Sequence, residues 1–171
     1  YDVNRDYLDK SRLGNFEILA NSRYAIRNFS SKPVDNDIIY KALDIAKKSP
    51  SACNRQAYRV HIFNNDLKNK LLLLQGGSKS FYESVDKVLL ISMDVNRYYT
   101  RERYLGYVDA SLFAMSLMYA LTYLGVGSIP LTLGIKQSIL DKIKKDFSIP
   151  SNETPVLLIG IGNYKENFKV A

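Results

Sequence analysis

Residues 109–124 read DASLFAMSLMYALTYL. Apart from Asp109 the stretch carries no charge, and apolar side chains would occur on nearly every side of the helix that it predicts. Such a helix must be covered on all sides, by its own domain or by a second subunit. Gly125 and Pro130 interrupt the apolar run soon afterwards, which favours a buried helix followed by a strand over a membrane span. We therefore expect a long buried helix at a homodimer interface and no membrane partner.

Helices and strands alternate in the rest of the chain. Residues 35–49 begin with Asp35, a typical helix cap, and their apolar side chains, Ile45 among them, recur at helical spacing. Residues 88–93 are continuously apolar and indicate a central strand, whereas residues 58–63 alternate and indicate a half-buried strand. We expect further helices over 15–23, 67–74 and 136–147, and a further strand over 155–161. Such a chain folds in layers of the α+β or α/β class.

The composition describes one globular domain of 171 residues, 46% of them hydrophobic. A net charge of +7 suits a phosphate-bearing molecule, nucleic acid or an acidic membrane, but the basic residues form no single block, which disfavours the last two. The single cysteine, Cys53, excludes an internal disulfide and indicates a reducing compartment, for which we expect the cytoplasm. No signal peptide is visible at the start of the sequence. Because the sequence opens at Tyr1 and not at a Met, we expect a trimmed or processed chain.

Residues 22–29 read SRYAIRNF and contain two arginines four positions apart. On a helical or turn-like path Arg23 and Arg27 would face the same ligand. Guanidinium groups hold a phosphate through paired hydrogen bonds, and a positive group also suits an electron-rich ring edge. By spacing alone, two solvated surface arginines are the alternative interpretation.

Residues 49–58 read SPSACNRQAY and join the end of a helix to the start of a strand. Loops in such places often carry function. Ser51, Asn54 and Gln56 offer small polar side chains and backbone amides, which suit the hydrogen-bonding edge of a heterocycle. A polar turn without a ligand is the alternative.

No other group of residues has the spacing of a catalytic or metal site. His61 is the single histidine and lies on a predicted strand, so no metal site is expected. Cys53 has no histidine partner for nucleophilic catalysis. The pair Gly160 and Gly162 follows a strand but lacks the third glycine and the helix of a dinucleotide fingerprint.

Taken in order, the two segments resemble the nitroreductase family. That family begins with an R-x-[ST/A]-x-R-x-F stretch, matched by residues 23–29, and continues one helix later with [AS]-P-S-[AS]-x-N-x-Q-P-W, matched by residues 49–58. Residues 109–111, 124–128 and 155–162 are similar to its long helix, its glycine turn and its last strand. The resemblance implies a three-layer α+β sandwich, with a mixed central sheet, flanking helices and a long buried helix at a dimer interface.

The resemblance also implies a flavoprotein, with FMN bound and NADH or NADPH as co-substrate. By position, Arg23, Tyr24 and Ala25 would contact the FMN phosphate and ribityl chain, and Arg27 would approach the pyrimidine edge of the ring. The other subunit would contribute Pro50, Ser51, Ala52 and Asn54, with Gln56 beside them. The ring itself would lie along Ile129, Pro130, Leu131 and Thr132.

Departures from the family pattern concern the loop and the phosphate. Gln56-Ala57-Tyr58 stands where the family has Gln-Pro-Trp, and Asn163-Tyr164 replaces a Gly-Tyr-Pro-like ending. Family members continue into a basic stretch that binds the phosphate, whereas this sequence runs only to Ala171. Lys165 and Lys169 are the candidates to replace that stretch, unless the stretch lies outside this sequence.

The sequence thus predicts an FMN-dependent oxidoreductase that passes electrons from NAD(P)H to a small acceptor such as a nitroaromatic or a quinone. Two alternatives stay open. One is a flavin-binding relic without turnover. The other is a nucleic-acid-binding domain that uses residues 96–107, NRYYTRERYLGY, where arginines and tyrosines interleave; a helix start or a lid over a flavin is the competing interpretation of that segment.

Overall fold

The structure, a computed structural model, describes residues 2–11 and 15–170. Its centre is a sheet of four strands in the order β2-β3-β5-β4, and every neighbouring pair is antiparallel. The bounds are β2 (Tyr58–Asn64), β3 (Lys87–Asp94), β4 (Val126–Thr132) and β5 (Glu153–Asn163). The four strands thus form an antiparallel sheet rather than the expected mixed one. Among the described residues, parallel pairing is limited to the isolated bridge between Ala25 and Ser128.

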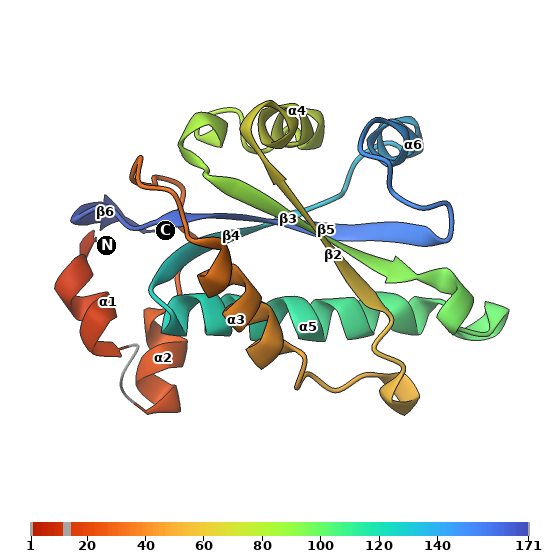
Figure 1. Cartoon of the computed structure of the whole chain (residues 1–171), viewed down its shortest axis with the longest axis horizontal. Coiled ribbons are helices and arrows are strands. Elements are labelled where there is room, and N and C mark those ends of the chain that lie inside the picture. The colour runs from red at the N-terminus through yellow and green to blue at the C-terminus, as the bar shows by residue number, and fades with distance from the viewer. Residues whose placement is uncertain (1, 12–14, 171) are drawn as a thin grey trace.

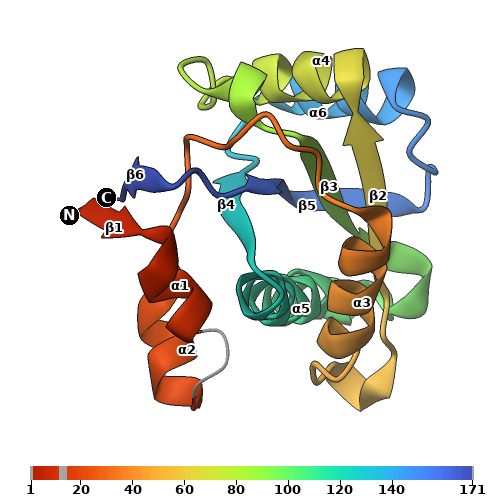
Figure 2. The same cartoon turned by 60° about the vertical axis from the view of Figure 1, so that its left-hand side comes forward.

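Helices cover both faces of this sheet and give the expected three layers (Figures 1 and 2). One face carries α4 (Asn65–Gln75) and α6 (Gln137–Asp146), and the other carries α3 (Asn36–Ala46) and α5 (Tyr104–Tyr123). The strand β3 is buried along its whole length and alternates between the two layers, with Leu90 in one core cluster and Leu89 in the other. Period-two alternation of this kind makes the central strand face both cores.

The two ends of the chain lie side by side, away from the main sheet (Figure 2). The short strand β1 (Asp2–Asn4) pairs antiparallel with β6 (Asn167–Lys169). Between β1 and α3 lie two short helices, α1 (Arg5–Ser11) and α2 (Phe16–Ser22). The sequence pattern predicted α2 but neither α1 nor the strand pair, since elements this short carry little periodicity.

The helix α3 has the predicted cap, because the Asp35 side chain accepts a hydrogen bond from the amide of Asp37. Its buried positions are Ile39, Ala42 and Ala46. Ile45 was expected on the same face, and this expectation is wrong: its side chain is 42% exposed. Six positions after Ile39, it lies about 240° around the helix, outside the buried stripe.

The helix α5 begins at Tyr104, five residues before its expected start, and Gly125 follows its end with a φ of 78° that favours glycine. By length and composition α5 is apolar enough to cross a membrane, yet 56% of its apolar window is buried inside the protein. It packs against α3 and the sheet through residues such as Phe113, Leu117 and Leu121. The expected sequence of a buried helix followed by a strand is confirmed by α5 and β4.

The glycine pair at the end of β5 serves packing. A Cβ atom on Gly162 would lie 2.6 Å from Cγ of Phe29, closer than real contacts allow. The ring of Phe29 therefore rests directly on the backbone of β5, and a bridge between Phe29 and Tyr164 fixes the chain beside it. This contact anchors the segment that carries Arg23 and Arg27.

We predict that Gly162→Ala lowers the free energy of unfolding by about 1–3 kcal/mol, because the added methyl group overpacks against Phe29. Gly134→Ala is the matched control, since nothing lies within 4 Å of the methyl group it would add, and it should leave stability equal or slightly higher. Chemical unfolding curves measure both. Equal stability of the two variants would contradict the direct contact.

Candidate functional site

The loop of residues 49–57 runs from the end of α3 to the start of β2 and holds five of the predicted site residues, Pro50, Ser51, Ala52, Asn54 and Gln56. A single 3-10 turn, Ala52–Asn54, forms its middle. The amide of Asn54 donates to the carbonyl of Ser51 at 2.9 Å, and the amide of Gln56 donates to the Ser51 hydroxyl at 3.0 Å. The Ser51 side chain therefore stabilises the conformation of the loop.

The backbone of this loop is strained. Cys53, Asn54 and Gln56 have φ values of 49°, 53° and 46°, in the left-handed region that non-glycine residues rarely adopt. Strain of this kind is stored where surrounding contacts over-determine it, and it clusters at functional sites. In this conformation the Cys53 and Asn54 side chains are exposed.

Two contacts tie the loop to the start of α5. The buried carboxylate of Asp109 accepts a hydrogen bond from the amide of Ala52 at 3.0 Å and another from the hydroxyl of Tyr98 at 2.7 Å. Arg55 forms an ion pair with Glu102 at 3.0 Å, and its guanidinium carbon lies 5.3 Å from the centre of the Tyr98 ring. The loop is thus braced against residues 98–109.

Burial, the hydrogen bond to Asp109 and the charge of Asp109 raise the pKa of Tyr98 well above its ordinary value. Tyr98 is therefore a neutral donor at physiological pH. Next to it, the Tyr58 ring stacks on Phe113 with centroids 4.0 Å apart, and the buried Tyr58 hydroxyl has no hydrogen-bond partner in the described part of the chain. Burial is the main cause that raises the pKa of Tyr58.

A second group of predicted residues lies at the opposite edge of the sheet. The segment of residues 23–29 runs beside β4, where Ala25 bridges Ser128 and the amide of Ile26 donates to the Ser128 carbonyl at 3.0 Å. A helical path for Arg23 and Arg27 is not found, because α2 ends at Ser22; the segment instead pairs with β4 at Ala25 and then reaches Tyr164 at Phe29.

Beyond Ala25 the segment does not continue along β4, because Phe29 bridges Tyr164 at the end of β5. Arg23 is half-buried and Arg27 is exposed, and neither forms an ion pair with a described carboxylate. Both guanidinium groups are therefore available to an anionic ligand.

The four predicted residues on β4, residues 129–132, alternate between the buried core and the exposed surface. The side chains of Ile129 and Leu131 lie in the core beneath α4 and α6, while Pro130 and Thr132 face outward. Only the backbone of the first two is therefore available to a ligand. Because β4 is an edge strand, half of its backbone groups point away from β5, and Pro130 sits where a missing amide is tolerated.

Lys165 is exposed just after Tyr164, which bridges Phe29, and so lies near the end of the segment of residues 23–29. Of Lys169 the structure describes the backbone alone, so its expected part in phosphate binding lies outside the described side chains. The two predicted groups thus differ in place. One group lies toward the β4 edge and comprises Arg23, Tyr24, Ala25, Arg27, Lys165 and residues 129–132. The other group, residues 50–56, lies toward the β2 edge.

These two edges are separated by two strands, β3 and β5. Neighbouring strands lie about 4.8 Å apart, which puts roughly 14 Å between β2 and β4. Within one chain the two signature segments therefore lie at opposite edges of the sheet.

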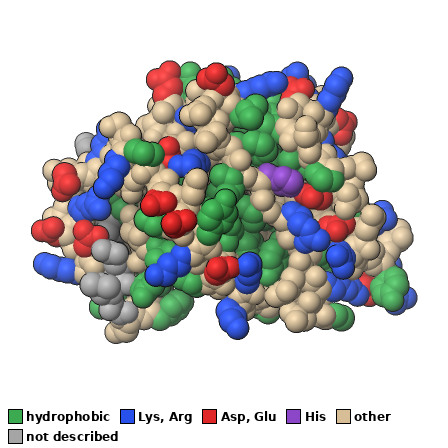
Figure 3. Space-filling model, viewed as in Figure 1, with side chains coloured by type: hydrophobic (Ala, Val, Ile, Leu, Met, Phe, Trp, Pro, Cys, Tyr) green, Lys and Arg blue, Asp and Glu red, His purple; other side chains and the backbone are tan. Residues whose placement is uncertain are grey.

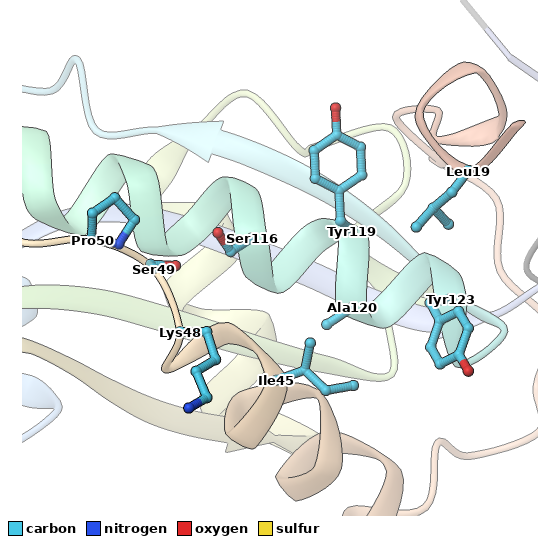
Figure 4. A pocket seen from close by; sticks show the side chains of 9 residues that line it. All are labelled: Leu19, Ile45, Lys48, Ser49, Pro50, Ser116, Tyr119, Ala120 and Tyr123. Carbon is cyan, nitrogen blue, oxygen red and sulfur yellow. The ribbon is translucent and has the colours of Figure 1, made fainter. Parts of the chain in front are cut away.

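A pocket of about 370 Å³ opens beside the loop, between α2, α3 and α5 (Figure 4). Pro50 is the one predicted site residue in its lining, which also includes Ile45, Lys48 and Tyr119. The lining is mostly apolar, and Lys48 is the one cationic residue in it. It is a surface on which aromatic or aliphatic groups fit.

The outer side of α5 is apolar and exposed. Tyr104, Tyr107, Val108, Leu112 and Tyr123 are each 43–65% exposed. A contiguous apolar surface along one helix is typical of an interaction site.

The segment of residues 96–107 buries one of its four tyrosine rings. Tyr98 lies against Asp109, whereas Tyr99, Tyr104 and Tyr107 are 48–68% exposed. Tyr104 and Tyr107 belong to α5, which confirms the interpretation of this segment as a helix start. Figure 3 shows Lys and Arg scattered among Asp and Glu on the face it displays, without a basic block.

Elsewhere, His61 contacts the buried Glu153 at 2.6 Å, and the Ser92 hydroxyl donates to the same carboxylate oxygen. Because Ser92 and His61 each bond Glu153 rather than one another, the trio lacks the nucleophile–base contact of a catalytic triad. Among the described residues, no group of three His, Cys, Asp or Glu side chains could hold a metal ion.

The sequence reasoning missed Asp109, Tyr98 and Arg55. Asp109 was noted only as the charge at the start of an apolar stretch. A lone carboxylate beside such a stretch signals a buried charge, and a buried charge requires donors. That signal could have identified it as a structural partner of another segment.

Comparisons with known proteins point in one direction. The profile of the Nitroreductase family matches residues 20–88. The 4-nitrobenzoate reductase of Pseudomonas putida is 32% identical over 88 residues, which cover 52% of this chain and 38% of that protein. The iodotyrosine deiodinase of Thermotoga neapolitana is 30% identical over 134 residues, which cover 67% of this chain and 72% of that protein. The chain thus spans well under half the length of the first of these relatives.

The fold is also found in solved structures. The FMN-dependent nitroreductase of Clostridium difficile R20291 superposes with a TM-score of 0.76 at 19% identity, covering 90% of each chain. The agreement confirms the predicted layered α+β architecture.

We predict that Tyr98→Phe lowers the free energy of unfolding at pH 8 by about 2 kcal/mol, the contribution of a hydrogen bond to a carboxylate. The pKa of Tyr98 is raised by folding, so its contribution is present below pH 10 and is lost as pH rises above that value. The difference between wild type and variant should therefore shrink in alkaline solution. Chemical unfolding between pH 7 and 11 measures it. Tyr40→Phe, at an exposed position of α3, is the control, and a pH-independent difference for Tyr98→Phe would contradict the assignment.

Proposed function

This chain belongs to the nitroreductase family, and from that premise we propose that it is an FMN-dependent oxidoreductase whose flavin site is shared between two copies of the chain. The observation that carries the proposal is the pair Arg23 and Arg27 on the segment beside the β4 edge. Neither arginine has a carboxylate partner among the described residues. Two cations without carboxylate partners on one segment suit an anionic cofactor.

The donor set fits FMN at both of its ends. Arg23 and Lys165 supply positive charge for the phosphate, and the Tyr24 and Ala25 segment would lie along the ribityl chain. Arg27 would stand at the pyrimidine edge of the ring, where a positive group stabilises the negative charge of the reduced form. The outward-facing backbone of β4 offers hydrogen-bonding groups along the ring.

A site shared between two copies would explain why the two signature segments, residues 23–29 and 49–58, lie apart within one chain. Residues 50–56 lie across the sheet from Arg23 and Arg27, so they would reach the flavin held by the other copy. The exposed apolar side of α5, with Tyr107 and Leu112, gives two copies a surface to bury against one another. Closed two-fold pairs, in which the same patch meets itself, are the commonest form of oligomer.

The bound flavin supplies the two-electron redox chemistry, and the residues of this chain position it and tune its electronics. No acid–base dyad is required of the protein. We propose NADH or NADPH as electron donor and a small oxidised aromatic, such as a nitroaromatic or a quinone, as acceptor. The relatives named after 4-nitrobenzoate and iodotyrosine support an aromatic acceptor. We also place the protein in the reducing cytoplasm, where an exposed free thiol such as Cys53 is stable.

We predict that the purified protein is yellow, releases FMN on heat denaturation and is bleached by NADH or NADPH without oxygen. A protein that is yellow but not bleached by either nucleotide would be the relic without turnover. A colourless protein that cannot be reconstituted with FMN would contradict both. A salt-sensitive shift of single-stranded DNA would instead favour nucleic-acid binding.

Arg27→Ala should weaken FMN binding about tenfold, the effect of one lost charge-assisted hydrogen bond, and should slow flavin reduction. Arg101→Ala is the matched control, an exposed arginine outside the predicted site. Titration followed by flavin fluorescence measures the affinity. Unchanged affinity and reduction rate in Arg27→Ala would remove that residue from the site.

A mixing experiment tests the sharing of the site between copies. Arg27→Ala damages the β4 side, and Asn54→Ala damages the loop side, so each variant alone should lose FMN affinity at every site. Refolded together, random pairing gives half mixed dimers with one intact site each, so roughly a quarter of all sites should regain wild-type affinity. If both damaged faces belonged to the same chain, mixing would restore nothing.

A further inference from the structure

Asp109 is a carboxylate at an unusual place. It lies in the second turn of an otherwise apolar helix and is 3% exposed. Burial of a charge is costly unless donors surround it. Its Oδ1 atom accepts from the amide of Ala52 at 3.0 Å, and its Oδ2 atom accepts from the hydroxyl of Tyr98 at 2.7 Å. Both oxygens are therefore engaged, by donors from two different segments.

The Ala52 amide belongs to the strained loop, next to the first residue of left-handed conformation. From there Cys53, Asn54 and Gln56 each have positive φ. Within the loop, the amides of Asn54 and Arg55 donate to the carbonyls of Ser51 and Ala52, and the amide of Gln56 donates to the Ser51 hydroxyl. The second half of the loop is attached to the fold through the ion pair of Arg55 with Glu102 at 3.0 Å and through Gln56, whose side chain donates to the Lys47 carbonyl and whose carbonyl accepts from Arg59. The first half is attached where the Asp109 carboxylate accepts from the Ala52 amide.

We propose that Asp109 is a positioning residue, which holds residues 51–56 in their strained form and so sets how the exposed face of this loop meets the flavin of the other copy. The second half of this statement rests on the proposed function, and the first half does not. Asp109 touches no ligand itself and acts through the backbone of Ala52.

Tyr98 and Arg55 complete the arrangement. The Tyr98 hydroxyl occupies the second carboxylate oxygen and so keeps the first one directed at Ala52. The guanidinium group of Arg55 lies 5.3 Å from the centre of the Tyr98 ring. Tyr98 therefore contacts both Arg55, which pairs with Glu102, and the Asp109 carboxylate. Loss of Asp109 would release the loop at Ala52 and leave it attached only through its second half, at Arg55 and Gln56.

Amide hydrogen exchange of the full-length chain, read by mass spectrometry on the peptide that covers residues 50–57, tests the hold on the loop without any flavin. In Asp109→Ala we expect these amides to exchange about tenfold faster, because local opening no longer breaks a charge-assisted hydrogen bond. The strand β3 should exchange at an unchanged rate, since it is buried along its length. Asp109→Asn, whose amide oxygen can still accept from Ala52, should restore most of the protection.

Thr122→Val is the matched control on the same helix. Thr122 is buried and its hydroxyl donates to the carbonyl of Met118 at 2.9 Å, so the variant removes a polar group from α5 far from the loop. It should leave exchange of residues 50–57 unchanged. Tyr98→Phe, which keeps the carboxylate, gives a smaller acceleration than Asp109→Ala and serves where that variant does not fold.

FMN titrations of the same variants test the consequence for the flavin, with an expected loss of affinity of about tenfold in Asp109→Ala and none in Thr122→Val. Unchanged loop exchange in Asp109→Ala or in Tyr98→Phe would overturn the positioning role. Faster exchange with unchanged FMN affinity would overturn its link to the flavin. If the wild-type protein binds no FMN, the flavin proposal fails, and the exchange result alone still decides whether Asp109 holds the loop.

Discussion

The packing of α5 against the sheet is the contact on which the rest of the molecule depends. Phe113, Leu117 and Leu121 bury their side chains beneath β3 and β5, and Phe113 also stacks on Tyr58 at the start of β2. This stack fixes where the loop of residues 49–57 ends. Because α5 is apolar all round, its burial on one side leaves an apolar surface on the other. The core and the proposed interface between copies are two sides of the same helix.

The antiparallel order β2-β3-β5-β4 separates the two signature segments. One segment enters β2 and the other runs along β4, and these are the two edges of the sheet. A strand edge presents unpaired backbone groups, which makes it a natural place for a ligand. The proposed sharing of one flavin between two copies would account for ligand-binding groups on opposite edges.

The polar groups at the start of α5 are held in place by burial rather than by attraction between exposed charges. Asp109 bonds an amide and a hydroxyl, and Arg55 bonds Glu102 over the Tyr98 ring. Desolvation strengthens each of these contacts and penalises any that is lost. This is the setting in which a loop with three left-handed residues keeps one conformation.

The sequence by itself determined the kind and order of the elements. The cap at Asp35, the apolar run of β3 and the glycine after α5 are local signals, set by spacing and backbone preference, and each was found in the structure. The ordered motifs also pointed to the family. Only the tertiary structure decided that the segment of Arg23 and Arg27 pairs with β4 at Ala25, that Ile45 is exposed and that Asp109 faces Ala52. These facts depend on contacts between residues far apart in the chain, and no local pattern of side chains encodes which partner a strand edge or a buried carboxylate will meet.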